Sequence, residues 1–405
     1  MKTYLVGGAV RDDLLGLEVF ERDWVMTGTT PEQLLSEGYK QVGASFPVFL
    51  HPKSNEEYAL ARTERKQGHG YHGFEVEFDP GVSIEDDLLR RDLTINAIAK
   101  DEQGNLVDPF GGQRDIKDRV LRHVSPAFAE DPLRVLRVAR FAARFADLGF
   151  SVHPQTLDLM RDIAHSGELG HLVAERSWRE IYRAMGSDQP SVFLKTLRAC
   201  NSLEVLLPEL DALYGVPQDA KWHPEIDTGA HTELAMDFAA EKKFGSNVVF
   251  AVMLHDLGKG LTPKSELPAH HGHENNGIPL VDQVCERFRV PKAIHKLSRQ
   301  VCAAHIRCHR VMEMRPAKIM NLLEQLDGFR QQDLTEFVQA CEADYRGRKG
   351  LQDRQYPQAE YLQSTLETAL SIQARDLLSE GVKQGPELGE KLRQARIQAI
   401  SGMRP

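Results

Sequence analysis

Strand signals in this chain are concentrated near its beginning. Of the 405 residues, the first 124 contain short apolar runs, flanked by turn residues, that predict strands at 4–6, 23–26, 48–51, 57–61 and 106–107. From Ser125 onward the pattern is typical of helices separated by short Gly and Pro breaks. We therefore expect an α+β fold, with a small mixed-sheet head at residues 1–124 and an all-helical remainder.

The helical remainder divides into three parts by its composition. A loop at 216–229 separates a neck and body, residues 125–227, from a histidine-rich block, residues 228–330. A polar helical tail, residues 331–405, follows. Within the head, the glycine-rich and polar residues 64–81 predict a mobile loop.

The overall composition is that of an ordinary globular protein, with 41% hydrophobic and 27% charged residues. We expect no membrane association, because no run of about 18 apolar residues is present. The first residues enter a strand and lack the pattern of a secretion signal. The five cysteines form no CxxC pair, which indicates reduced thiols and a cytoplasmic location.

The net charge of −9 does not by itself indicate a nucleic-acid-binding protein. Two local stretches are basic, however, at 114–144 and 287–299. Local patches govern phosphate binding more than the total charge does. Each stretch could equally be the solvated face of a helix.

A pair of acids follows a pair of glycines in the head. Glu21 and Asp23 are two residues apart on a predicted strand, so they share a face and could hold one divalent cation. The Gly7-Gly8 turn opens a predicted helix, whose free N–H groups suit phosphate. This combination favours nucleotidyl transfer. Glu57, which begins another strand, is either a third metal ligand or an exposed acid at a strand end.

Arginines recur in two later motifs. Arg90 and Arg91 are adjacent, so on a helix only one of them need face a triphosphate. On the predicted helix around residues 130–141, a set of arginines falls within an arc of about 120°, namely Arg134, Arg137, Arg140 and Arg144. The residues between them are mostly apolar, so these arginines require anionic or hydrogen-bonding partners. A salt-bridged surface helix is the alternative interpretation.

Asp131 lies at the start of the same helix, three residues before Arg134. Its carboxylate accepts hydrogen bonds and the Arg134 guanidinium donates them. Together they could read the Watson–Crick edge of a base.

These motifs are similar, in kind and order, to those of class II tRNA nucleotidyltransferases, the CCA-adding enzymes of the polymerase-β-like superfamily. The matching segments are Gly8 to Asp12, Glu21-x-Asp23, Arg90 to Ala97 and Glu130-Asp131-x-x-Arg134. The resemblance spans nearly the whole chain, including the histidine-rich block. The chain resembles the long bacterial form that carries an HD phosphohydrolase domain.

The resemblance implies roles for individual residues. Nucleotide contacts are expected from Gly8, Arg11, Arg91, Arg137 and Arg140, Mg²⁺ binding from Glu21 and Asp23, and selection of CTP or ATP from Asp131 and Arg134. The family normally has Asp-x-Asp where this chain has Glu21. The longer side chain shifts the geometry at an ion that tolerates little distortion.

The histidine-rich block contains a second constellation. His255 and Asp256 are adjacent on a predicted helix, and imidazole with carboxylate suits a transition metal. With the earlier His231 they resemble the HD phosphohydrolase signature, which also implies Asp344 as a ligand and Ni²⁺ as the metal. Further candidate ligands or phosphate donors are His270, His271, His273 and His305, whereas His295 and His309 are expected at the surface.

The resemblance implies stepwise addition of CMP, CMP and AMP from CTP and ATP to the 3′ end of tRNA. It also implies hydrolysis of 2′,3′-cyclic phosphates, 2′-nucleotides or other phosphoesters by the HD block. The protein would be a monomer or homodimer, since no heptad pattern demands a coiled coil.

Three alternatives stay open from the sequence. A bacterial poly(A) polymerase shares the head motifs, but it would use ATP alone and would not need the His255-Asp256 pair. A phosphohydrolase whose head is a relic, because of Glu21, is the second alternative. A tRNA-binding scaffold without chemistry is the third.

Overall fold

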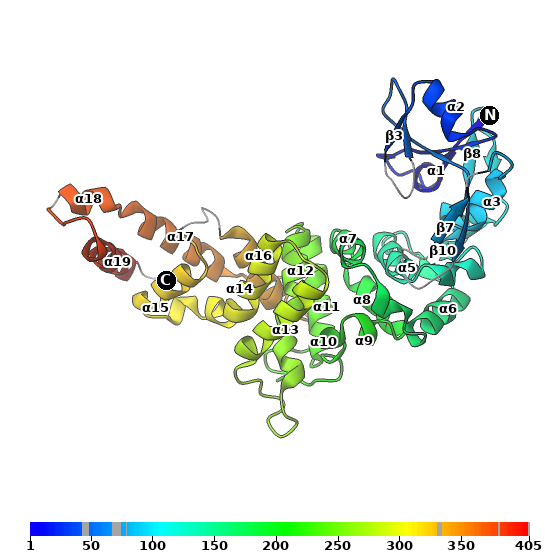
Figure 1. Ribbon diagram of the computed structural model, residues 1–405. Coiled ribbons are helices and arrows are strands. Elements are labelled where there is room, and N and C mark those ends of the chain that lie inside the picture. Colours follow the sequence, from blue (N-terminus) through cyan, green and yellow to red (C-terminus); the bar gives the residue numbers. More distant parts are fainter. Residues whose placement is uncertain (43–47, 67–73, 78, 330–333, 380, 404–405) are drawn as a thin grey trace. The chain divides into compact units, whose positions relative to one another are not determined.

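The computed structural model describes residues 1–42, 48–66, 74–77, 79–329, 334–379 and 381–403. The chain falls into two compact units (Figure 1). The first comprises Met1–Ala184 and Val192–Leu206, and the second comprises Met185–Ser191 and Leu207–Pro405. Each unit has its own architecture and its own cluster of polar residues.

A seven-stranded mixed sheet forms the centre of the head. Its strand order is β3-β4-β5-β2-β1-β8-β9, and only the β2–β5 pair among these neighbours is parallel. The strands are β1 (Lys2–Val6), β2 (Asp23–Thr27), β3 (Lys40–Val42), β4 (Val48–Leu50), β5 (Glu57–Leu60), β8 (Ala99–Asp101) and β9 (Leu106–Val107). All five predicted strands are confirmed. The sequence pattern missed β3 and β8, which have three residues each, too few to establish an alternation.

The expected loop at 64–81 is partly wrong. Strand β6 (Thr63–Lys66) pairs antiparallel with β7 (Phe74–Glu77) in a separate two-stranded sheet. Thr, Phe and Val have high strand propensity, and here it outweighs the flanking glycines. Residues 67–73 and 78 lie outside the described part of the chain.

Helices cover the sheet of the head on both faces because its strands alternate apolar residues to both sides. Tyr4, Val6 and Val25 form one core with Ile84 and Leu88 of a covering helix. Met26, Phe49 and Leu60 form a second core with Leu34. The helices are α1 (Gly8–Leu14), α2 (Pro31–Ser36), α3 (Ile84–Leu89), η2 (Thr94–Asn96) and α4 (Gly112–Asp118).

The rest of the first unit is almost entirely helical. Its elements are β10 (Val120–Leu121), η3 (Pro126–Glu130), α5 (Leu133–Arg144), β11 (Ser151–Val152), α6 (Pro154–His165), η4 (Glu168–His171), α7 (Ala174–Met185), α8 (Ser191–Ala199) and α9 (Leu203–Leu206). Strand β11 pairs parallel with β10, so the expectation of an all-helical chain after residue 124 fails at this two-residue strand. The sequence pattern missed β11 because two residues are too few to show an alternation, and because its pairing with β10 depends on the tertiary fold.

The second unit is a helical assembly around α12 (Ser246–Leu254), which is buried from Val248 to Leu254. Helix α12 contacts α11, α14 and α16. The other helices are α10 (Pro208–Asp211), α11 (Thr228–Glu241), η5 (Leu257–Leu261), α13 (His273–Arg287), α14 (Lys292–His309), η6 (Val311–Glu313), α15 (Pro316–Gln325), α16 (Thr335–Arg346), α17 (Pro357–Ser371), α18 (Ala374–Ser379) and α19 (Pro386–Ser401). A helix apolar on every side, such as α12, is typical of a domain core.

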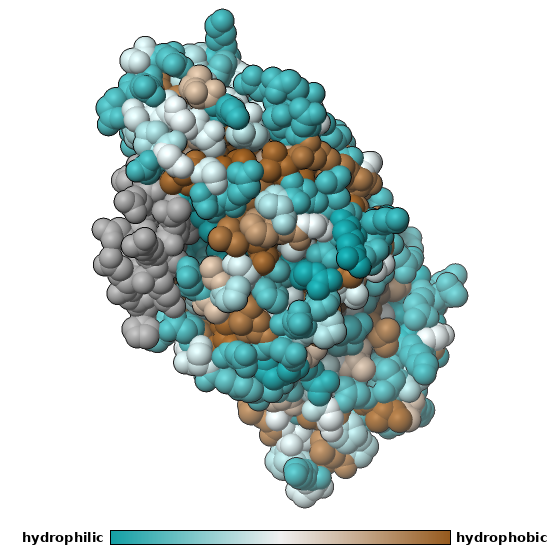
Figure 2. Space-filling model, turned by 90° about the vertical axis from the view of Figure 1, so that its right-hand side faces the viewer, coloured by the Kyte–Doolittle hydropathy of each residue, from teal (hydrophilic) through white to brown (hydrophobic). Residues whose placement is uncertain are grey.

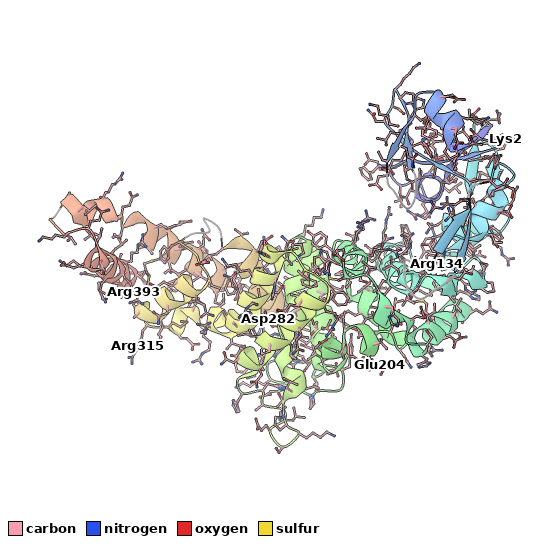
Figure 3. All side chains as sticks on the ribbon, viewed as in Figure 1. Lys2, Arg134, Glu204, Asp282, Arg315 and Arg393 are labelled. Atoms are coloured by element: carbon pink, nitrogen blue, oxygen red, sulfur yellow. The ribbon has the colours of Figure 1, made fainter. Side chains whose placement is uncertain are left out.

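The basic stretch at 287–299 is an ion-paired helix surface. Asp282, labelled in Figure 3, accepts from His295 and Arg299 of α14, and Lys296 pairs with Asp327. These contacts favour the solvated-face interpretation for this stretch. His295 is half-buried beside Asp282, so the expectation that it is a surface residue is only partly correct.

The described surface mixes polar and apolar residues. The face in Figure 2 carries hydrophobic patches separated by hydrophilic residues, as is usual for a globular protein. Within the described ranges, every helix is too short or too polar to cross a membrane.

Candidate active sites

An arginine-rich pocket of about 510 Å³ opens in the first unit. Both glycines of the Gly7-Gly8 turn, both members of the acid pair and several side chains of α5 line this pocket. Four lining residues are acidic, whereas ten are arginines, namely Arg11, Arg62, Arg90, Arg91, Arg134, Arg137, Arg140, Arg144, Arg176 and Arg183. Such an excess of fixed positive charge suits a polyanion such as a triphosphate.

The acid pair lies at the pocket but not on one strand. Strand β2 begins at Asp23, so Glu21 lies in the irregular segment before it, and the prediction of two acids on one strand is wrong. The preceding residues lack the apolar alternation that would extend the strand. Both side chains nevertheless line the pocket. Burial by neighbouring groups raises the pKa of Asp23, Arg91 opposes this rise and the nearby Glu21 adds to it.

Glu57 lies directly across from Asp23 in the parallel β2–β5 pair. Its side chain is exposed, and it is absent from the residues that line the pocket. Among the described residues, the groups of three or more donors able to hold a metal all lie elsewhere, in the second unit. The acid pair would therefore rely on substrate oxygens and water to complete a cation's coordination.

The two adjacent arginines follow α3, which ends at Leu89, and both line the pocket. The buried carboxylate of Asp87 holds them, with contacts of 2.7 Å to Arg90 and 3.0 Å to Arg91. Although burial opposes it, these arginines lower the pKa of Asp87. Gly7 has φ +66°, and a Cβ there would lie 2.8 Å from Arg91 Nη1. Glycine at this position therefore permits the turn and leaves room for Arg91.

Arg11 is buried beside Gly8 on α1. It pairs with Asp12 at 2.8 Å and donates to Asn96 Oδ1 at 2.5 Å. Burial lowers the pKa of Arg11 to about 10, even though Asp12 opposes this change. Asp12 also accepts from Arg144 of α5 at 2.9 Å. Asp12 thus links α1 to α5 at the pocket.

The predicted arginine arc on α5 faces the pocket, since all four of its arginines line it. Arg137 pairs with Asp92 at 2.7 Å, and Arg140 donates to Glu180 of α7 at 2.5 Å. Burial opposes ionisation of Asp92, yet Arg137 and Asn96 hold the pKa of this carboxyl far below its ordinary value. The sequence-based expectation that these arginines need anionic or hydrogen-bonding partners is therefore confirmed.

Asp131 and Arg134 both line the pocket, each held by a different partner. Asp131 accepts from Arg176 at 3.0 Å. Arg134, labelled in Figure 3, donates to the carbonyls of Ala127 at 2.8 Å and Arg90 at 2.5 Å. These contacts fix both side chains at the wall of the pocket.

The residues that hold the arginines were not singled out from the sequence. Glu180 lies in the segment Ser177-Trp-Arg-Glu180 and looks like an ordinary surface acid until α7 packs against α5. The sequence indicated that the α5 arginines need anionic partners, but it did not indicate that Glu180 is one of them. Asp12 and Asp92 lie within the matched motifs and Asp87 lies three residues before one, but their arginine partners became apparent only in three dimensions.

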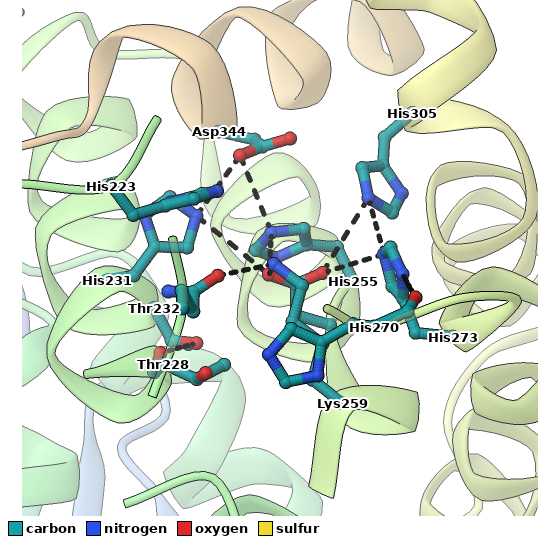
Figure 4. A network of polar contacts seen from close by, with 12 residues as sticks. His223, Thr228, His231, Thr232, His255, Lys259, His270, His273, His305 and Asp344 are labelled. Atoms are coloured by element: carbon teal, nitrogen blue, oxygen red, sulfur yellow. Dashed lines mark hydrogen bonds and ion pairs between the residues drawn. The ribbon is translucent and has the colours of Figure 1, made fainter. Parts of the chain in front are cut away.

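The second unit contains a buried cluster of histidines and carboxylates at the point where α11, α12, α13, α14 and α16 meet (Figure 4). His231 lies 3.1 Å from Asp344 Oδ1 and 3.9 Å from Asp256 Oδ2. His255 lies 3.1 Å from Asp256 Oδ2. The four residues predicted from the sequence are therefore together, and each is almost fully buried.

Two basic side chains lie beside the carboxylates of this cluster, with Lys259 2.6 Å from Asp256 Oδ2 and Arg348 3.0 Å from Asp344 Oδ1. Asp256 and Asp344 are both buried, and among the residues that the structure describes neither oxygen of Asp256 has a hydrogen-bond partner of acceptable geometry. Burial would lower the pKa of His255, but Asp256 and Asp344 raise it to about 10. His255 Nδ1 lies against the carbonyl of Val252, so its Nε2 is the ring atom that faces the Asp256 carboxylate. The imidazole and carboxylate donors fit a divalent transition metal.

Two of the further candidate histidines lie at this cluster, together with one histidine that was expected elsewhere. His273 and His305 lie 3.3 Å and 3.6 Å from Asp256 Oδ1. His309 is largely buried and lies 2.6 Å from Asp344 Oδ2, so its prediction as a surface residue is wrong. Its place near the end of α14 disguised the burial, which depends on packing against α16 and Tyr356.

Other members of the expected histidine set lie farther out. His270 contacts Thr262 and the carbonyl of Pro217, and His271 is exposed. Lys259, which sequence reasoning did not select, lies 2.6 Å from both Asp256 Oδ2 and Gln218 Oε1.

Close relatives match the chain over almost its whole length. The "Multifunctional CCA protein" of Hahella chejuensis is 55% identical, with 99% of this chain and 95% of that protein covered. The protein of the same name from Pseudomonas fluorescens is 56% identical, with 99% and 98% covered. This chain belongs to the multifunctional CCA protein family. Identity of this level over both lengths places both sites within the shared sequence.

Three domain families match this member of the multifunctional CCA protein family. "Poly A polymerase head domain" matches residues 3–122, "Probable RNA and SrmB- binding site of polymerase A" matches 149–214, and "HD domain" matches 229–348. A solved structure of a Thermotoga maritima CCA-adding enzyme complexed with tRNA has the same fold. Its TM-score is 0.64 at 20% identity, with 100% of this chain and 88% of that chain covered.

Proposed function

We propose that this protein adds the CCA sequence to the 3′ end of tRNA, using CTP and ATP without a nucleic-acid template. The observation that carries the proposal is the pocket in which Glu21 and Asp23 face the arginines of α1 and α5. Membership of the multifunctional CCA protein family supports the same activity. The pocket combines an acidic place for a cation with a basic place for a triphosphate.

In this proposal Glu21 and Asp23 hold Mg²⁺, which when bound activates the terminal ribose hydroxyl of tRNA and neutralises the phosphates. Gly8, Arg11, Arg91, Arg137 and Arg140 contact the nucleotide. The fixed ion pairs of these arginines support the assignment, because donors held in place cost little reorganisation when charge develops. Oxygen donors of the acid pair fit Mg²⁺, which prefers carboxylates and water.

Asp131 and Arg134 select the base in this proposal. Their contacts to Arg176 and to two backbone carbonyls support this role, because a fixed donor and a fixed acceptor present a constant hydrogen-bond pattern. A base whose edge has complementary donors and acceptors binds well to such a pattern. A base with a different edge leaves polar groups of the site unpaired and binds more weakly.

The HD block hydrolyses phosphoesters in this proposal, with 2′,3′-cyclic phosphates and 2′-nucleotides as the expected substrates. His231, His255, Asp256 and Asp344 hold the metal, for which we propose Ni²⁺. Their buried, acceptor-rich arrangement supports the assignment. Lys259, beside Asp256, is placed to balance negative charge near the ion.

We further propose that tRNA, CTP and ATP are the partners of the first unit, and that the protein acts in the cytoplasm as a monomer or homodimer. The five cysteines are free and buried, which supports a reducing compartment. The division of the chain at residues 1–124, 125–227, 228–330 and 331–405 stays a proposal.

A primer assay tests the main activity. Purified protein is incubated with Mg²⁺, tRNA lacking its last three nucleotides, and each nucleoside triphosphate in turn. We expect CTP alone to add two residues and ATP to add one more only after them. Unlimited addition of A would instead indicate a poly(A) polymerase.

The Glu21→Asp variant distinguishes an active nucleotidyltransferase head from a head that is an inactive relic. The shorter side chain restores the usual Asp-x-Asp pattern, so CCA addition should be kept or increased. A relic head or a tRNA-binding scaffold predicts no addition by either protein. Asp23→Ala then serves as the inactive reference.

A further inference from the structure

The loop at residues 217–227, which leads into α11, lies against the buried cluster of the second unit. Gln218 Oε1 lies 2.6 Å from Nζ of Lys259, a neighbour of the cluster. Glu225 Oε1 lies 2.8 Å from Nδ1 of His231. The loop is therefore held to the cluster near both of its ends.

The middle of this loop is held by Arg348, in the segment after α16. Its guanidinium donates to the carbonyl of Trp222 at 3.1 Å and to Asp344 Oδ1 at 3.0 Å. Because Arg348 is buried, water competes little for these hydrogen bonds. The ring of the next residue, His223, packs against His231 with centroids 4.6 Å apart (Figure 4). The backbone of Trp222 is therefore fixed beside the cluster.

The side chain of Trp222, unlike its backbone, lies largely in solvent. The residue is 55% exposed, and the ammonium of Lys221 lies over its ring, 4.8 Å from the centroid. Single exposed apolar residues are common on protein surfaces. Trp222 differs from such residues because one buried arginine connects its backbone to Asp344. An exposed aromatic ring with a cation beside it suits a nucleotide, whose base stacks on the ring and whose phosphate meets the positive charge.

Ile226 of the same loop has a costly backbone conformation. Its φ is +64°, in the left-handed region that β-branched side chains avoid, and the side chain is 48% exposed. The carbonyl of Ile226 accepts from the N–H of Gln218 at 2.8 Å, which holds this conformation. Strain of this kind is typical of loops that are shaped for a ligand.

The charges around Arg348 favour an anionic ligand. Lys221 is exposed on the loop, and Lys349 is exposed directly after Arg348. The N–H of Lys349 donates to Glu225 Oε2 at 3.2 Å, so both lysines belong to segments that are joined at the cluster. A phosphorylated ligand with an aromatic base matches the indole and the lysines together.

We propose that Trp222 stacks with the base of the nucleotide whose phosphoester the buried cluster hydrolyses, and that Lys221 supplies positive charge beside it. This inference rests on the proposed phosphohydrolase function and deepens it. The substrates are then phosphoesters that carry a nucleobase, rather than phosphoesters in general. Because every base has a face that can stack, the site accepts any of the four bases.

A pair of substrates that differ only in the base tests the proposal on the full-length chain. The first is 2′,3′-cyclic AMP, and the second is methyl ribofuranoside 2′,3′-cyclic phosphate, which has the same cyclic phosphate and no base. Trp222→Ala should lower the ratio of kcat/KM for the first substrate to that for the second about tenfold, mainly through KM for the first. An unchanged ratio would overturn the proposal.

Two further variants separate stacking from a change in the fold of the loop. Trp222→Phe retains an aromatic ring and should keep most of the preference for the substrate with a base. Leu378→Ala is the matched control, because it removes an exposed apolar side chain from α18, and it should leave the ratio as in wild type. A loss in Trp222→Phe as large as that in Trp222→Ala would contradict stacking.

Fluorescence distinguishes failure of this inference from failure of the proposed function. Adenosine 2′-phosphate, titrated without added metal, should quench more emission in wild type than in Trp222→Phe, since both proteins retain Trp24 and Trp178. This difference without hydrolysis of either substrate would keep the base-binding site and lose the phosphohydrolase. Hydrolysis of both substrates without the difference would keep the phosphohydrolase and lose the base-binding site.

Discussion

Arg137 donates from Nε to Oδ2 of Asp92 across 2.8 Å and thereby joins α5 to the segment after α3. Asp92 also accepts from Asn96, which in turn accepts from Arg11. One buried carboxylate thus holds, directly or through one neighbour, two of the arginines at the pocket. This relationship makes Asp92 the position from which the nucleotide site is most easily disturbed.

Asp92→Asn should weaken both the fold of the head and nucleotide addition. The side chain of Arg137 is 33% exposed and keeps a contact of 3.7 Å to Glu180, so the loss of stability should be about 1–3 kcal/mol, below the cost for a fully buried pair. Addition should fall mainly through kcat/KM for the nucleotide, measured with primer tRNA. Asp118→Asn is the control, since this exposed acid pairs with exposed Arg114, and it should shift stability by no more than about 0.5 kcal/mol.

The pH dependence checks the same ion pair. Because the folded-state pKa of Asp92 lies far below its unfolded value of about 3.9, the stabilisation is fully present above that pH. It is lost as the pH falls toward the folded-state pKa. The difference in unfolding free energy between wild type and Asp92→Asn should therefore be constant near neutral pH and shrink below about pH 4. A difference that grows in acid would contradict this assignment.

Asp23→Asn should stabilise the metal-free head while abolishing nucleotide addition. The raised pKa of Asp23 means that the carboxylate is less favourable in the folded protein than in the unfolded chain. A neutral amide removes that cost, as expected where a functional site holds unfavourable charge. Thermal unfolding without Mg²⁺ should show a higher Tm for the variant. A lower Tm would indicate that the carboxylate has a structural role.

Arg134→Ala should reduce discrimination between correct and incorrect nucleoside triphosphates. Loss of one fixed pair of donors costs about 1–3 kcal/mol of base discrimination, or roughly tenfold to a hundredfold. The ratio of kcat/KM for CTP and UTP on primer tRNA measures this effect. Arg114→Ala, which removes an exposed arginine of α4, should leave the ratio unchanged. An equal loss for all nucleotides would instead assign Arg134 to phosphate binding.

His255→Asn and Asp256→Asn should abolish phosphoesterase activity and leave CCA addition intact. Their ligand atoms belong to the buried cluster of the second unit, whereas the arginine pocket is built entirely from the first unit. Hydrolysis of a 2′,3′-cyclic nucleotide and primer extension should be measured on the same preparations. Joint loss of both activities in a folded variant would argue against two separate sites.

The sequence was most informative where a motif is local. The five strands, the arginine arc of α5 and the His255-Asp256 pair follow from spacing along a single element, and spacing is what a sequence displays. Glu21 shows the limit of this reasoning, because two residues of separation imply a shared face only if both residues belong to the strand.

Partners that depend on tertiary packing could not be predicted in the same way. Glu180 reaches Arg140 only because α7 packs against α5, and His273 reaches Asp256 only because Gly258 admits α13. His309 illustrates the reverse error. Its polar neighbours in the sequence indicate a surface, whereas packing against Tyr356 and Asp344 buries it.

The most direct measurement of the central claim is a crystal structure of the protein with CTP and Mn²⁺, in which anomalous scattering locates the ion. We predict an ion held by the carboxylates of Glu21 and Asp23, with the triphosphate against the arginines of α1 and α5. An empty pocket, with the nucleotide bound elsewhere on the protein, would contradict the account.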